Sequence, residues 1–155
     1  MKENSRFKFR AWDYENKQWV YGYYTKLVEG IRKYDAIVSE DGGSLVRYYI
    51  KDIKTLGQYT GLKDKNGVEI YDGDILQFND CFLDNTKPLL NIKHLGRIEA
   101  TAGGFVFVRQ YWWNDPFYPE MGEALADMQT KSWIRSNCEI IGNIYENPEL
   151  LEDKQ

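Results

Sequence analysis

Stretches in which apolar and polar residues alternate occupy much of this chain. In the first, residues 6–12, one side of an extended strand carries apolar residues and the other carries Lys8, Arg10 and Trp12. Alternation with a period of two is typical of a β-strand with two different faces. A polar turn and a second alternating stretch follow, so we expect an N-terminal β-hairpin over residues 6–24.

Glycine pairs separate further strand-like stretches. Gly42-Gly43 lies between residues 34–39 and 45–50, and Gly103-Gly104 lies between residues 97–101 and 105–109. Glycine adopts the positive φ of a tight hairpin turn without steric cost, so both segments predict hairpins. Residues 74–79 and 139–145 predict two more strands.

Helical signals are few. Residues 120–131 have some helical character, and a short C-terminal helix is expected where Asn147 offers an N-cap and Pro148 occupies the first helical position. We therefore predict a mainly β fold, an antiparallel barrel- or sandwich-like sheet with a short C-terminal helix. A length of 155 residues favours one domain over residues 1–155, with loop or insertion regions at 80–91 and 112–131.

The middle of the chain is rich in turn-forming residues. Glycine permits chain reversal, while aspartate and asparagine cap turns by accepting hydrogen bonds from nearby backbone N–H groups. The residues to which we assign this fold-specifying role, together with Asn147 and Pro148, are Gly61, Asp64, Asn66, Gly67, Asp72, Gly73, Asp74 and Gly142. A calcium loop needs regularly spaced oxygen ligands and a distal bidentate glutamate, a pattern that these aspartates lack. We expect no metal site.

The usual signatures of catalysis are missing from the sequence. His94 has no local nucleophile signature, and Cys81 and Cys138 lie in no zinc-binding or redox spacing. No phosphate-binding glycine motif is present. We expect no catalytic residue, no cofactor and no enzymatic activity, although an enzyme with residues scattered along the chain stays an alternative.

The charge is unevenly distributed. The formal net charge is −4, yet residues 1–33 contain 8 basic and 4 acidic residues, whereas residues 34–155 contain 12 basic and 20 acidic. The negative total disfavours nucleic acid as a partner. The basic N-terminal hairpin keeps nucleic-acid binding open as an alternative, because Lys8, Arg10 and Trp12 could neutralise phosphates and stack on bases.

Aromatic residues are abundant, with 12 Tyr, 5 Trp and 7 Phe. One group lies in a proline-containing loop and either caps the core or contacts a partner: Trp112, Trp113, Phe117 and Tyr118. The aromatic excess and the opposite charges of the two regions predict a homo-oligomer. No apolar signal region or membrane-length apolar run occurs, so the cytoplasm is the expected location and no membrane is expected as a partner.

Four segments together carry a family resemblance: residues 7–13, 58–67, 69–75 and 140–151. In this order they resemble the YopX family of phage and prophage proteins. The resemblance implies a phage or prophage origin, a bacterial host cytoplasm and self-association, and it supplies no catalytic residue. The expected function is that of a non-enzymatic accessory protein that acts by protein binding or self-association, with a host or phage protein as a further partner.

Overall fold

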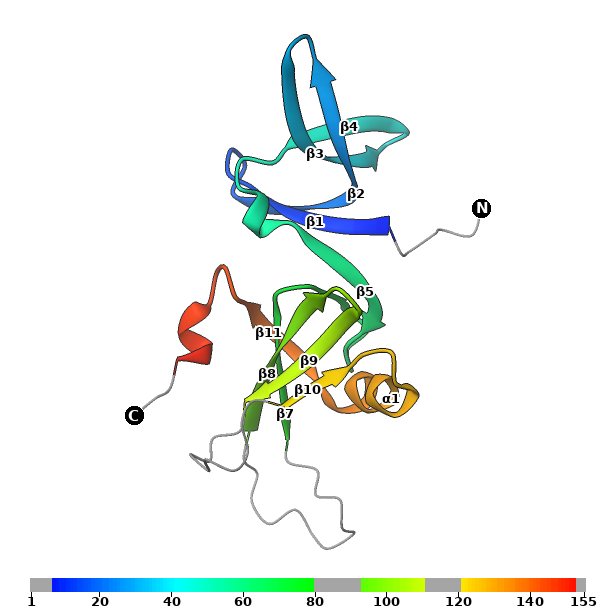
Figure 1. Cartoon of the computed structure of the whole chain (residues 1–155), viewed down its shortest axis with the longest axis vertical. Helices are drawn as coiled ribbons and strands as arrows, with labels where there is room; N and C mark the ends of the chain where they lie inside the picture. Colours follow the sequence, from blue (N-terminus) through cyan, green and yellow to red (C-terminus); the bar gives the residue numbers. More distant parts are fainter. Residues whose placement is uncertain (1–6, 80–92, 111–120, 153–155) are drawn as a thin grey trace, which may run out of the picture. The chain divides into compact units, whose positions relative to one another are not determined.

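The chain contains two compact units (Figure 1). The computed structural model describes residues 7–79, 93–110 and 121–152. We call residues 1–61 the N-terminal unit and residues 62–155 the C-terminal unit. The loop expected at residues 80–91 lies outside the described residues.

The N-terminal unit is built on antiparallel strands in the order β4-β3-β2-β1-β5. Its elements are β1 (Lys8–Asp13), β2 (Gln18–Glu29), β3 (Arg32–Asp41), β4 (Ser44–Tyr49), the 3-10 helix η2 (Ile53–Thr55) and β5 (Gly57–Lys63). The hairpin expected over residues 6–24 is present as β1 and β2, and the Gly42-Gly43 hairpin is present as β3 and β4. Strand β5 continues into the C-terminal unit.

One side of this sheet forms the core of the N-terminal unit. Ala11, Val20 and Ile37 are buried there, and Phe9 and Tyr24 pack against them. Those on β1 and β2 occupy alternate positions, as the apolar periodicity predicts, and Ile37 on β3 lies opposite Tyr24. The other side of β1 therefore carries the polar and aromatic residues.

The C-terminal unit contains a five-stranded sheet with the order β10-β9-β8-β7-β11. Its elements are β6 (Glu69–Tyr71), which follows β5 in the strand order, β7 (Asp74–Asn79), β8 (Lys93–Thr101), β9 (Gly104–Gln110), β10 (Met121–Ala124), α1 (Met128–Asn137), β11 (Glu139–Asn143) and the 3-10 helix η3 (Pro148–Leu151). Strand β7 has the predicted bounds, and β8 and β9 form the predicted Gly103-Gly104 hairpin.

Helix α1 supplies part of the core of the C-terminal unit. Ile134 is buried, and the Trp133 ring lies 5.1 Å, centroid to centroid, from the Phe78 ring. Gly96 on β8 leaves space for Phe107, since a Cβ there would lie 2.4 Å from Phe107 Cε2. Close packing around aromatic rings thus depends on one residue that lacks a side chain.

The mainly β, antiparallel fold class is confirmed, and neither strand order closes on itself in the part of the chain that the structure describes. The helix expected at residues 120–131 is displaced: it begins at Met128, because Asp127 accepts a 2.7 Å hydrogen bond from the Thr130 N–H and caps it. The expected loop region 112–131 accordingly contains β10 and the start of α1.

The C-terminal helix is a four-residue 3-10 turn. Pro148 occupies its first turn as expected, and Asn147 stands at the N-cap position. The Asn147 side chain makes no capping bond, however; its Oδ1 accepts from the Asn143 N–H at 3.4 Å. That interaction joins the end of β11 to the turn that follows it.

Candidate binding face on the N-terminal sheet

Strand register adds three aromatic residues to the face predicted on β1. Trp19, Tyr21 and Tyr23 of β2 lie directly opposite Trp12, Arg10 and Lys8, respectively. Directly opposed residues of an antiparallel pair project from the same side of the sheet. We define the aromatic–basic face by these residues: Lys8, Arg10, Trp12, Trp19, Tyr21 and Tyr23. The alternation in β2 is visible in the sequence, but its match to β1 requires the register.

Arg10 is buried within this face. Its side chain is 6% exposed, and its guanidinium carbon lies 4.6 Å from the centroid of the Trp19 ring. The Trp12 and Trp19 rings meet edge to face with centroids 5.5 Å apart. A cation over an indole face is stabilised by the ring quadrupole. Arg10 therefore packs inside the face and is not presented to solvent, in contrast to the exposed role considered from the sequence.

Tyrosines form the exposed part of the same face. Tyr21 and Tyr23 are 43% and 52% exposed and lie two residues apart on β2. The register extends this side of the sheet across β3 to β4, where Tyr23 aligns with Val38 and Val38 with Arg47. Tyr49, at 45% exposure, projects from the same side of β4. We call Tyr21, Tyr23 and Tyr49 the tyrosine face.

Tyr49 is held by two neighbours. Its ring packs edge to face on Tyr34 with centroids 5.3 Å apart, and its hydroxyl donates a 2.9 Å hydrogen bond to Glu29 Oε1. The hydrogen bond to the Glu29 carboxylate raises the pKa of Tyr49 above its ordinary value. The ring contact and the hydrogen bond orient this end of the face before any partner binds.

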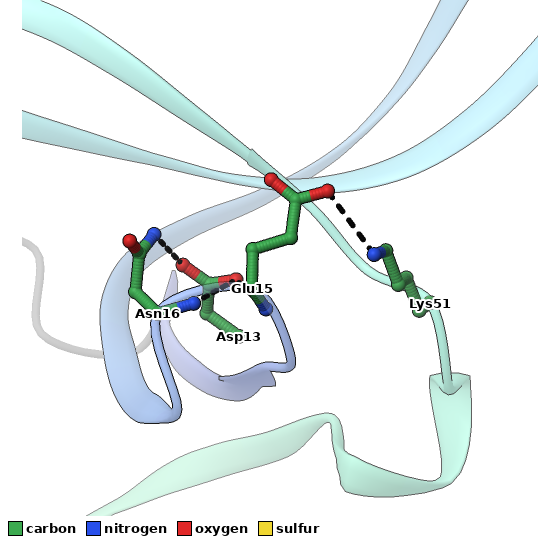
Figure 2. Close-up of polar contacts among 4 residues, drawn as sticks. All are labelled: Asp13, Glu15, Asn16 and Lys51. Atoms are coloured by element: carbon green, nitrogen blue, oxygen red, sulfur yellow. Dashed lines mark hydrogen bonds and ion pairs between the residues drawn. The ribbon is translucent and has the colours of Figure 1, made fainter.

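The turn that joins β1 to β2 fixes the register of the face (Figure 2). Asp13 Oδ1 accepts from the Glu15 N–H at 2.9 Å, and Asp13 Oδ2 accepts from Asn16 Nδ2 at 2.6 Å. Lys51 Nζ lies 3.1 Å from Glu15 Oε1. The Asn16 side-chain amide is the largest cause that lowers the pKa of Asp13. The charged Asp13 carboxylate thus holds a turn for which the sequence indicated only polarity.

Outside this face, the turn aspartates bind backbone N–H groups. Asp64 accepts from Asn66, Val68 and, 76 residues away in sequence, Ile140. Asp74 Oδ2 accepts from the Tyr71 N–H at 2.8 Å, and Asp72 Oδ1 accepts from the Ala100 N–H at 2.9 Å across to β8. Their carboxylates serve the fold. In the residues that the structure describes, no group of three acidic, histidine or cysteine residues gathers to hold a metal ion.

The glycines of these turns adopt the expected conformations. Gly61, Gly67 and Gly73 have φ values of 81°, 82° and 85°, a region that side chains disfavour. Gly142 lies at a register shift of β11, where a Cβ would lie 2.4 Å from Asn147 Oδ1. These positions specify chain direction and close packing.

The remaining candidates fall in the core or outside the described residues. His94 is buried and its ring stacks on Phe78 with centroids 5.5 Å apart, while Cys138 is buried in the same core. Cys81 and the aromatic loop residues lie outside the described residues: Trp112, Trp113, Phe117 and Tyr118. Within the described ranges, no helix is both long and apolar enough to span a membrane.

A family model described as YopX protein matches residues 8–152. The chain belongs to the YopX family. The solved structures include one similar to this YopX-family chain, the crystal structure of protein EF1440 from Enterococcus faecalis, with 28% sequence identity and a TM-score of 0.49. That similarity covers 94% of this chain and 97% of the other. No curated protein matches the sequence.

Proposed function

We propose that this YopX-family chain is a non-enzymatic binding protein and that the tyrosine face of its N-terminal unit receives a protein partner. The observation that carries the proposal is the alignment of exposed Tyr21 and Tyr23 on one side of the sheet. Tyrosine gives a large contact area at low cost in side-chain entropy, and aromatic residues are enriched in protein interfaces.

The burial of Arg10 favours protein over nucleic acid as the partner. A nucleic-acid platform needs cations that reach phosphates, and the Arg10 guanidinium is instead held over Trp19. Lys8, Arg32 and Arg47 are the basic residues that the register leaves on this side of the sheet. The N-terminal unit does contain 11 basic and 8 acidic residues, which keeps nucleic acid as the second candidate.

The proposed setting follows from the family resemblance. The protein would act in the cytoplasm of a bacterial host as an accessory protein of a phage or prophage, and its partner would be a host or phage protein. In such a setting the rim around the tyrosines would supply specificity and the rings would supply most of the binding energy.

Site-specific photocrosslinking tests the proposal. A benzophenone amino acid replaces Tyr21 or Tyr23, and the matched control places it at Tyr14, which is 46% exposed but lies in the β1–β2 turn. We expect a discrete protein adduct in host extract from the two sheet positions and none from Tyr14, reproduced with the purified partner. Adducts to nucleic acid, or equal labelling at Tyr14, would overturn the proposal.

A further inference from the structure

Strand β4 is an edge strand in which Arg47 is the only charged residue. It begins the strand order of the N-terminal unit, and its six residues, Ser44–Tyr49, include neither proline nor lysine. Its register with β3 runs without a shift, whereas β11, an edge of the other sheet, carries a bulge near Gly142. Native edges are commonly blocked by charges, proline or bulges, so a regular edge that has one charge and neither of the other two features can still be a template for another strand.

The hairpin turn determines which backbone groups face outward. Gly42 and Gly43 have φ values of 56° and 82°, which fit a two-residue type I′ turn closed by a hydrogen-bonded Asp41–Ser44 pair. Hydrogen-bonded pairs then recur every second residue. The Ile50 N–H donates to the Asp35 carbonyl at 2.8 Å, as this alternation requires. The outward N–H and C=O groups consequently belong to Leu45, Arg47 and Tyr49.

Two large hydrophobic side chains of this edge strand are exposed. Leu45 is 76% exposed and Tyr49 is 45% exposed. Their outward N–H and C=O groups face no further strand among the described residues. A second strand would cover both the backbone groups and part of this apolar surface.

Charge selects a second copy of this chain as the occupant. Arg47 and Glu40 project from the same side of the sheet, and in the described part of the chain neither forms an ion pair. Glu40 lies opposite Leu45. If Arg47 of a second copy lay on the outer side of Leu45, its apolar stem would cross Leu45 and its guanidinium would approach Glu40, about 10 Å or two strand spacings away. A two-fold axis makes this contact twice.

We propose that two copies pair their β4 strands antiparallel about a two-fold axis at Val46. Leu45 and Arg47 of one copy then exchange about four backbone hydrogen bonds with Arg47 and Leu45 of the other. Val46 faces Val46 of the second copy at a position without backbone hydrogen bonds. Tyr49 of each copy covers Gly43 of the other. An axis at Arg47 would set two like charges directly opposite each other, which is unfavourable. This dimer goes beyond the partner proposed for the tyrosine face, and of that face it uses Tyr49 alone.

Disulfide trapping tests the register. The variant Val46→Cys is made in a Cys81→Ser background, with Cys138 retained because it is buried. The Cβ atoms of the two introduced cysteines would lie about 4.5 Å apart at a position without backbone hydrogen bonds, which permits a disulfide. In the control Arg47→Cys, the two cysteines would be diagonal neighbours across the two β4 strands, about 7–8 Å apart and too far for a disulfide. Arg47 is more exposed than Val46, so exposure alone would favour the control. We expect a covalent dimer from Val46→Cys alone; its absence, or equal dimer from Arg47→Cys, overturns the proposal.

Exchanging the charges of Glu40 and Arg47 tests whether a second copy of the chain pairs with β4. Glu40→Arg should weaken the dimer about tenfold in Kd, measured by sedimentation equilibrium, because it removes two attractions and adds two repulsions. The double variant Glu40→Arg with Arg47→Glu should restore dimerisation. Both positions are exposed, so the fold is checked by circular dichroism. If Glu40→Arg sediments like the parent, the proposal is overturned. Tyr21→Ser should leave this dimer intact while weakening the partner contact of the tyrosine face, so the two proposals can fail independently.

Discussion

Arg10 and Trp19 form a cation–π pair that spans the first two strands, with the guanidinium carbon 4.6 Å from the ring centroid. The two residues lie on neighbouring strands and are diagonal to each other in the register, since Trp19 opposes Trp12 and Arg10 opposes Tyr21. The pair stabilises a charged residue that is 6% exposed. It also removes Arg10 from the residues that could contact an external anion.

Trp19→Ala should lower the free energy of unfolding by about 2 kcal/mol, because it removes a half-buried ring and leaves the Arg10 guanidinium without its aromatic contact. Urea titration followed by circular dichroism measures the change. Tyr23→Ser on the same face serves as the control and should cost less than about 0.5 kcal/mol, since Tyr23 is 52% exposed. Equal losses for the two variants would contradict the structural role of Trp19.

Asp64→Ala should destabilise the C-terminal unit by about 3 kcal/mol, because three backbone N–H groups lose their acceptor. Asp64→Asn keeps one oxygen in a similar place and should cost roughly half as much. Thermal and urea unfolding of both variants provide the measurement. Unchanged stability of Asp64→Ala would show that water replaces this carboxylate without penalty.

Gly96→Ala should cost about 1–3 kcal/mol through overpacking, since the added Cβ would lie 2.4 Å from Phe107 Cε2. Gly103→Ala, in the turn of the same β8–β9 hairpin, is the matched control, because no heavy atom lies within 4 Å of its added Cβ. Denaturant midpoints compare the pair. The outcome that contradicts the packing argument is a Gly103→Ala loss as large as that of Gly96→Ala.

Acid should weaken the β1–β2 turn through Asp13. Hydrogen bonding, first from the Asn16 side chain, holds the Asp13 pKa below its ordinary 3.8. A carboxyl group with a lowered folded pKa stabilises the fold fully above its unfolded value, and this contribution is lost as the pH falls through the folded value. The stability gap between the parent and Asp13→Asn should therefore be constant above about pH 5 and shrink below about pH 4.

Urea unfolding between about pH 2.5 and pH 6 measures that gap directly. Asp127→Asn at the cap of α1 is a useful comparison, because the backbone hydrogen bond from Thr130 lowers the pKa of Asp127 in a different part of the chain. If the gap for Asp13 stayed constant down to the lowest pH, the turn would not depend on the charged carboxylate.

Local chemistry in the sequence was sufficient to predict most hairpins. Gly42-Gly43 and Gly103-Gly104 mark turns, and alternating apolar residues mark the strands on either side, because hairpin geometry depends on neighbours only a few residues apart. The apolar pattern predicts a helix over residues 120–131, several residues before α1 begins at Met128. Its true start depends on a single cap, Asp127, whereas the apolar positions that suggested a helix before Met128 belong partly to strand β10.

Local patterns along the chain were enough to establish that it is mainly β, that its turns are built from glycine and aspartate, and that it resembles YopX sequences. The arrangement of the polar side of β1 required the folded structure, because the register with β2 sets Trp19 beside Arg10 and leaves Tyr21 and Tyr23 exposed. Alternation along one strand reveals which residues share a side. Which strand lies next to it, and at what register, depends on packing between segments that are distant in sequence.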